Sequence, residues 1–152
     1  MISLKVLQGS LFGVLLLCFN TVQARSSDSY MEVGVVSTML VQPSVGYWWN
    51  DYGLRLSGIY QDALHHEYHV NIGYVLADEG EMQHAVNLLS SWVVGSDPGA
   101  NYDYAATGVA YSINYYGFFV ELGLALPWRD NLGNLANDPV IPCGMFGYIY
   151  RF

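Results

Sequence analysis

The sequence predicts an all-β protein, an eight-stranded antiparallel up-and-down transmembrane β-barrel preceded by a cleaved signal peptide. Three observations support this fold class. Apolar residues alternate with small or polar residues at a period of two, not at the 3.6-residue period of a helix. Only 12% of the 152 residues are charged while 53% are apolar, so charges are too few to cover an ordinary water-facing surface. Asn, Asp, Gly and Pro separate the alternating stretches, as turns require.

Residues 1–24 are expected to be a secretory signal peptide. Lys5 precedes the apolar run Leu11–Cys18, and Val22-Gln23-Ala24 is a small-residue cleavage pattern. The run is shorter than the about 20 apolar residues that a membrane-spanning helix needs. Cleavage after Ala24 leaves one barrel domain over residues 25–152, in which Cys143 is the only cysteine. A lone thiol excludes an internal disulfide and a cysteine metal site.

Eight strands follow in the mature chain, each bounded by turn residues. Their expected ranges are 29–40, 44–49, 53–61, 65–77, 82–94, 102–114, 118–128 and 143–152. The first ends before Pro43, the second before Asn50-Asp51, and the fourth at Asp78-Glu79-Gly80. Turns after the second, fourth and sixth strands are short, whereas connections after the third, fifth and seventh are longer. This asymmetry is typical of bacterial barrels with short periplasmic turns and longer outer loops.

The two faces of the predicted strands decide between a soluble core and a lipid-facing surface. In the seventh strand, one face holds Phe118, Val120, Leu122, Leu124, Leu126 and Trp128, and the other holds Phe119, Glu121, Gly123 and Ala125. The fourth strand sets His66, Tyr68, Val70, Ile72, Tyr74 and Leu76 against His65, Glu67, His69, Asn71 and Gly73. A water-facing set would be rich in Lys, Glu and Arg. We therefore expect the apolar face to contact lipid and the other face to fill a narrow lumen.

Aromatic residues gather near the expected periplasmic turns. They are Tyr47, Trp48, Trp49, Tyr52, Tyr74, Tyr115, Tyr116, Tyr148 and Tyr150. Such side chains suit a membrane interface, because an apolar ring there meets a polar tip. We interpret them as an aromatic girdle.

The ending Phe146-Gly147-Tyr148-Ile149-Tyr150-Arg151-Phe152 places aromatics at alternate positions. It resembles the C-terminal signature of Gram-negative outer-membrane β-barrels, and the whole chain resembles the small barrels of the OmpA-domain and OmpX type. The resemblance implies an outer-membrane location and recognition of Tyr148, Tyr150 and Phe152 by the barrel assembly machinery. It also implies contact with outer-membrane lipid and lipopolysaccharide. Barrels of this size serve structural, adhesive and enzymatic roles, so the resemblance leaves the extracellular ligand open.

Charged residues on the expected lumen face form the clearest constellation. Glu32, Arg55, Glu121 and Arg151 fall toward the periplasmic end of their strands. Because an eight-stranded barrel is just wide enough for side chains to fill, we expect these two acids and two arginines to pair with one another. A filled lumen argues against a general porin. The role expected from these features is structural or surface-interacting.

The segment from His65 to His69 carries the densest group of side chains that can bind a metal ion or transfer a proton. On a strand, His65, Glu67 and His69 share a face, with neighbours about 7 Å apart. Glu67 with either histidine could share a metal ion, but all three could not, and hydration at a strand end is the simpler interpretation. We assign no cofactor.

The alternative function is an outer-membrane lipid-modifying enzyme, a lipid A hydrolase or acyltransferase with a site at the barrel rim. It would use His66 or His69 with Ser96 and Asp97. The sequence departs from two such families. The lipid A deacylases place His and Ser two residues apart, which none of the four histidines here does, and the palmitoyltransferases add an N-terminal helix. A net charge of −8 with no basic cluster excludes a nucleic-acid partner.

Overall fold

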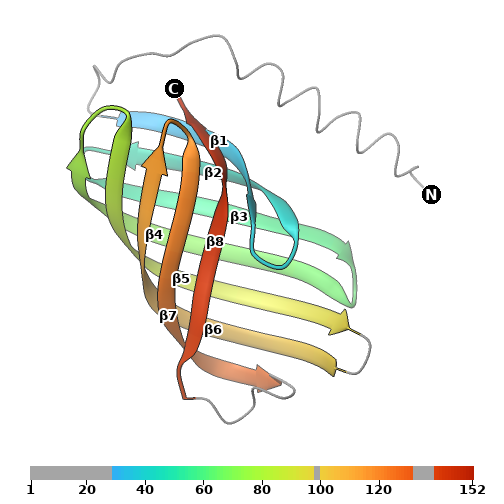
Figure 1. The fold of residues 1–152 in the computed structure, drawn as a ribbon. Helices are drawn as coiled ribbons and strands as arrows, with labels where there is room; N and C mark the ends of the chain where they lie inside the picture. Colours follow the sequence, from blue (N-terminus) through green and yellow to red (C-terminus); the bar gives the residue numbers. More distant parts are fainter. Residues whose placement is uncertain (1–28, 98–99, 132–138) are drawn as a thin grey trace, which may run out of the picture.

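The computed structural model describes residues 29–97, 100–131 and 139–152, and they form eight antiparallel strands. The strands are β1 (Ser29–Ser37), β2 (Val41–Trp49), β3 (Tyr52–Asp62), β4 (His65–Asp78), β5 (Met82–Asp97), β6 (Ala100–Tyr115), β7 (Phe118–Asn131) and β8 (Ile141–Arg151). Each strand pairs with the next, and β8 pairs with β1 to close the barrel (Figure 1). The predicted all-β barrel with eight antiparallel strands is therefore confirmed.

The predicted strand ends lie within three residues of the observed ones. The predicted signal peptide lies outside the described residues. None of the described residues belongs to a helix long and apolar enough to cross a bilayer.

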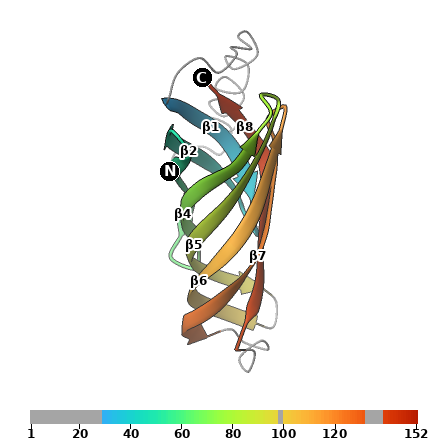
Figure 2. The same ribbon diagram turned by 90° about the vertical axis from the view of Figure 1, so that its left-hand side faces the viewer.

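The barrel has two different ends. The turn end carries the β2–β3, β4–β5 and β6–β7 turns, and there the backbones of Met31 and Phe152 exchange two hydrogen bonds. The loop end carries the other connections. Between the two ends the strands are tilted and curve around the barrel (Figure 2). The β6–β7 turn puts Tyr116 and Gly117 at φ +49° and +90°, the paired positive values that a tight hairpin turn favours.

The side chains are distributed inside out relative to a soluble protein. On β7, Leu122 is 67% exposed and Leu124 is 61% exposed, whereas Glu121 between neighbouring outward residues is 2% exposed. On β4, Ile72 faces outward while Asn71 is buried. The inward and outward faces predicted for β4 and β7 are confirmed. In the described ranges, buried charged and polar side chains share the interior with three apolar clusters, while large apolar side chains cover much of the outer surface.

Trp48 was wrongly assigned to the aromatic girdle. Its side chain is buried in the lumen and stacks on Tyr30, with ring centroids 6.1 Å apart. A Cβ at Gly53 or Gly73 would lie 2.2 or 2.5 Å from the Trp48 ring, so these glycines leave the space that the indole occupies. Neighbouring residues of a strand point to opposite faces, so Trp48 points inward because Tyr47 points outward. Its residue type suits a membrane interface, but strand alternation decides where the side chain lies.

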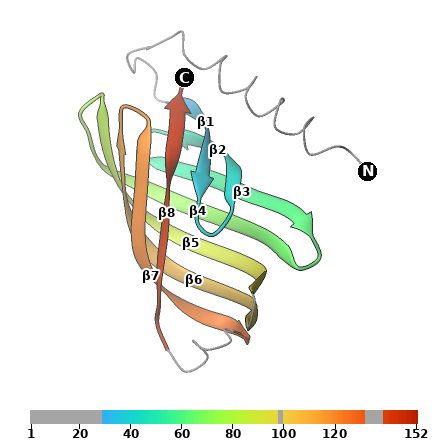
Figure 3. The same ribbon diagram turned by 45° about the vertical axis from the view of Figure 1, so that its right-hand side comes forward.

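The wall of the barrel is lower on one side of the loop end. The pairing of β2 with β3 stops at Ser44–Ser57, and the pairing of β1 with β8 stops at Ser37–Phe146. Beyond these points, residues 58–62 of β3 pair with β4, and residues 141–145 of β8 pair with β7, each leaving its other edge without a strand partner among the described residues. Figure 3 shows the β1–β2 hairpin ending well short of the β3–β4 turn. We call this gap the notch.

Candidate functional site

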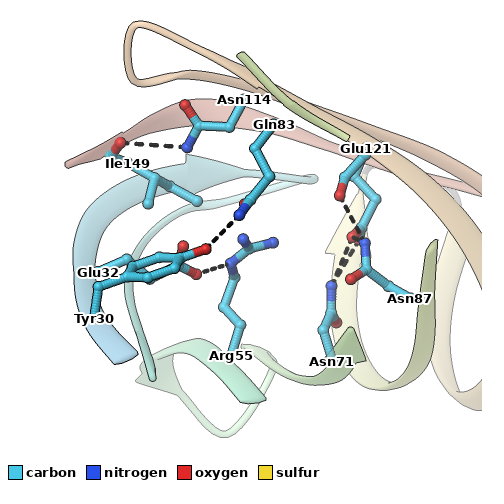
Figure 4. A network of polar contacts seen from close by, with 10 residues as sticks. Tyr30, Glu32, Arg55, Asn71, Gln83, Asn87, Asn114, Glu121 and Ile149 are labelled. Atoms are coloured by element: carbon cyan, nitrogen blue, oxygen red, sulfur yellow. Dashed lines mark hydrogen bonds and ion pairs between the residues drawn. The ribbon is translucent and has the colours of Figure 1, made fainter. Parts of the chain in front are cut away.

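The interior near the turn end contains a buried ion pair. Arg55 on β3 donates from Nε to Glu32 Oε1 on β1 at 2.5 Å, and both side chains are at most 3% exposed (Figure 4). The guanidinium also lies over the Phe119 ring, 4.2 Å from its centroid. The cationic guanidinium is attracted to the face of the ring, so this cation–π contact and the charge pairing together hold Arg55 in place.

Glu121 on β7 is held by amides. Asn71 Nδ2 donates to both carboxylate oxygens at 2.8 Å, and Asn87 Nδ2 donates to Oε2 at 2.7 Å (Figure 4). These residues come from β4 and β5, across the lumen from β7. Because hydrogen bonds to a charged acceptor are strong in a low-dielectric interior, the three contacts tie opposite walls of the barrel together.

Arg151 lies apart from the other predicted lumen charges. Its Nη1 is 3.7 Å from Asp78 Oδ2, and its Nη2 donates to the Asn114 carbonyl at 3.3 Å. The structure thus brings Glu32 and Arg55 together. It gives Glu121 amide partners and places Arg151 against Asp78, the last residue of β4.

The half of the lumen toward the loop end holds a cavity of about 230 Å³. Its polar wall is formed by Thr38, His69, Asn71, Ser91 and Glu121, and its apolar wall includes Leu89, Val93, Ala106, Ala125, Ile141 and Met145. Tyr104 and Cys143 also line the cavity. The expectation that side chains fill the lumen throughout is therefore wrong in this half. The inward side chains of this half include small alanines, whereas those of the turn half include the large rings of Trp48 and Phe119.

A hydroxyl, an imidazole and a carboxylate meet at the polar wall of this cavity. His69 Nδ1 lies 2.7 Å from Ser91 Oγ, and His69 Nε2 lies 3.5 Å from Glu67 Oε2. With the imidazole proton on Nε2, facing the carboxylate, Nδ1 accepts the hydrogen bond of the Ser91 hydroxyl. Thr38 and Gln42 also donate to Glu67 Oε2. Glu67 therefore fixes the orientation of His69, and His69 that of Ser91.

Thr38 and Gln42 were not singled out from the sequence, and the mid-barrel serine Ser91, although a candidate nucleophile by residue type, was not connected with His69. Ser91 lies directly opposite His69 in the β4–β5 pairing. The register shifts by one residue between Val75 and Ala77, so counting back from the β4–β5 turn would pair His69 with Trp92 and would miss Ser91.

The predicted rim site does not assemble. His66 faces outward among aromatic rings, with centroids 5.6 Å from Tyr60 and 5.8 Å from Trp92. The Ser96 hydroxyl donates to Asn101 Oδ1, and the side chain of Asp97 lies outside the described part of the structure. His66 and His69 lie on opposite faces of β4, and register pairs His69 with Ser91, five residues before Ser96.

The three candidate metal ligands do not converge at one point. His65 Nδ1 lies 3.1 Å from Asp62 Oδ1, and its Nε2 lies 3.1 Å from the Ser96 carbonyl oxygen. Glu67 contacts His69 deeper in the lumen. Within the described ranges, no group of three or more His, Cys, Asp or Glu side chains is arranged to hold a metal ion.

The C-terminal aromatics lie on the outer face of β8. Tyr148 and Phe152 are 40% and 54% exposed, and the Tyr150 and Phe152 rings stack with centroids 6.1 Å apart.

Comparison of the chain with protein-family models, with curated proteins and with solved structures gave no match.

Proposed function

We propose that this protein is a small integral outer-membrane β-barrel with a structural or surface-interaction role. The observation that carries the proposal is the inverted distribution of side chains. Outward positions on every strand hold large apolar residues, while Glu32, Glu67, Glu121 and Arg55 are buried inside. Lipid favours this arrangement, because exposing so much apolar surface to water is unfavourable.

The lengths of the strands and the shape of the two ends support the same proposal. β1 and β2 have nine residues each, and the longest strands have 16. Tilted strands of about 9–11 residues span a bilayer, so the longer strands would project beyond it at the loop end. The turn end would face the periplasm and the loop end the cell exterior.

Outer-membrane lipid and lipopolysaccharide are the partners proposed for the outward surface, and the barrel assembly machinery is the partner proposed for β8. Tyr148, Tyr150 and Phe152 present the alternate aromatics of β8 on that surface. Among the resolved inward residues, the buried Glu32–Arg55 pair and the packed Trp48 and Phe119 rings obstruct the turn half of the lumen. These features favour a role other than that of a general porin.

Cell fractionation followed by gel electrophoresis of boiled and unboiled samples tests the proposal. An integral barrel is expected in the outer-membrane fraction and should resist carbonate extraction. Its unboiled form should migrate differently from its boiled form, because a folded barrel stays compact in detergent. Recovery in the periplasmic supernatant without detergent would contradict the proposal.

A further inference from the structure

We infer that the cavity in the loop half of the lumen binds one acyl chain with an uncharged polar head, and that the chain enters from the membrane through the notch. The inference rests on the proposed function, since it needs lipid outside the barrel. Eight-stranded barrels are wide enough either to be filled by side chains or to hold one small ligand. In this lumen, side chains fill the turn half, and the loop half contains the cavity.

The apolar wall of the cavity has the size and chemistry for a single hydrocarbon chain. Leu89, Ala106, Ala125 and Ile141 belong to one buried apolar cluster and also line the cavity. A methylene group takes up about as much space as a water molecule in liquid, roughly 30 Å³, so a cavity of about 230 Å³ holds on the order of eight carbons. Ala106 and Ala125 leave this volume open because their side chains end at Cβ.

The polar wall favours an uncharged head group. Glu121 lines the cavity and Glu67 contacts His69 beside it, whereas no Lys or Arg belongs to its described lining. An anionic head would be repelled by these carboxylates. The Glu121 oxygens already accept hydrogen bonds from Asn71 and Asn87. His69 already uses both ring nitrogens, on Ser91 and Glu67, so the Ser91 oxygen is left to accept a hydrogen bond from a hydroxyl or amide.

The notch leads from the outer surface to the cavity. Thr38 and Met39, in the β1–β2 turn, border the notch and line the cavity, and so do residues 141–145 of β8. The β8 edge lies within the apolar outer band, because Pro142 is paired with Leu124 and the exposed Leu126 follows further toward the loop end. A hydrocarbon chain can therefore reach the cavity from the side, without passing through water at the loop end.

Photocrosslinking in lipid tests the inference. The mature barrel is placed in phosphatidylcholine vesicles with decanol carrying a diazirine at its far end, irradiated, and mapped by peptide mass spectrometry. Saturable crosslinks to inward residues of β5, β6 and β8 are expected, and unlabelled decanol should compete. The matching decanoate probe should crosslink at least about fivefold less, corresponding to about 1 kcal/mol. Crosslinks confined to outward residues, or equal labelling by decanoate, would overturn the inference.

A second arm identifies the source of the chain. A diacylglycerol, whose head is an uncharged hydroxyl and two esters, carries the same diazirine on one acyl chain and replaces decanol. Inward crosslinks from this lipid identify membrane lipid as the ligand, and inward crosslinks from decanol alone identify a free amphiphile. Absence of inward crosslinks from both probes contradicts the site.

Two variants that fill the cavity, Ala106→Leu and Ala125→Leu, should each reduce inward crosslinking about tenfold. Val109→Leu is the matched control, because Val109 lies on the same strand as Ala106 and faces outward. The heat-modified gel mobility of every variant is measured first, so that failure of the membrane barrel is recognised separately from failure of the binding site. Unchanged crosslinking in both folded variants would refute the inference.

Discussion

The Glu32–Arg55 pair concentrates charge at one point of the interior. Glu32 Oε2 and Arg55 Nη1 are buried without a hydrogen-bond partner in the structure, so each charge depends strongly on the other. The free energy of removing two charges from water is largely offset by their attraction only while both are present.

Arg55→Met is therefore expected to lower the free energy of unfolding by about 3–5 kcal/mol, because it leaves the Glu32 carboxylate buried and uncompensated. The double variant Glu32→Gln with Arg55→Met should recover most of that loss. Urea unfolding in lipid vesicles, followed by tryptophan fluorescence, measures both. Equal losses in the single and double variants would show that the pair is not coupled.

A second residue-scale contact lies in the turns and responds to pH. The Tyr116 hydroxyl donates to the Glu81 carboxylate, and this hydrogen bond raises the pKa of Tyr116 above its ordinary value. Since the folded-state pKa exceeds the unfolded value of about 10, the contact contributes stability below that pH and loses it as the pH rises through the folded-state pKa.

The melting temperature of the native protein should therefore exceed that of Tyr116→Phe near neutral pH, and the difference should vanish at strongly alkaline pH. Glu81→Gln is the matched variant, because it removes the charged acceptor. In the Glu81→Gln variant, the Tyr116 hydroxyl should ionise at a lower pH than in the native protein, as followed by ultraviolet absorbance. A difference that stays constant across the alkaline range would contradict this assignment.

At the scale of elements, β8 has the largest role in closing the barrel. It pairs with β7 over residues 141–148 and with β1 over residues 146–151, while its outer face carries the aromatics that resemble an assembly signal. Its contribution to assembly can be separated from its contribution to stability.

Phe152→Ala is expected to reduce the folded fraction in the outer membrane shortly after synthesis several-fold, while the purified, refolded variant keeps near-native stability. Phe146→Ala is the matched control, because Phe146 is also outward-facing on β8 but lies six residues from Phe152. Pulse labelling with unboiled gels measures the folded fraction. Equal assembly defects in both variants would contradict a specific signal at Phe152.

The strands were predictable because alternation and turn residues are local signals. The loop-half cavity was not, because it depends on how far β2 pairs with β3 and β1 with β8, which pattern alone does not fix. The pairing of Glu32 with Arg55 followed from their shared face, whereas Arg151 and Asp78 are the last residues of β8 and β4, two strands that are not neighbours, so alternation along one strand does not predict their contact. The contact of His69 with Ser91 could not be predicted by counting from the turn, because the β4–β5 register shifts between Val75 and Ala77.

At the scale of the whole molecule, the proposed lipid contact makes a prediction about charge. Leu122 lies midway along the outward face of β7, whereas Leu64 lies in the β3–β4 turn at the loop end. Both side chains are strongly exposed. In a membrane, Leu122→Arg should lower the free energy of unfolding by about 2–4 kcal/mol and Leu64→Arg by about 0–1 kcal/mol. Chemical unfolding in vesicles measures the difference. Effects below about 0.5 kcal/mol at both positions would indicate that water faces both.

The seam between β1 and β8 also has a kinetic consequence. Seven of the eight strand pairings join neighbours in sequence, but this one joins residues more than a hundred positions apart. Loop-closure entropy makes it the most expensive pairing to form, so we expect it to form last. In a Cys143→Ser background, a disulfide between cysteines at Val35 and Tyr148 should therefore form later in refolding than one between cysteines at Ile113 and Val120. Until that last step the molecule is an open, curved sheet with two unpaired edges.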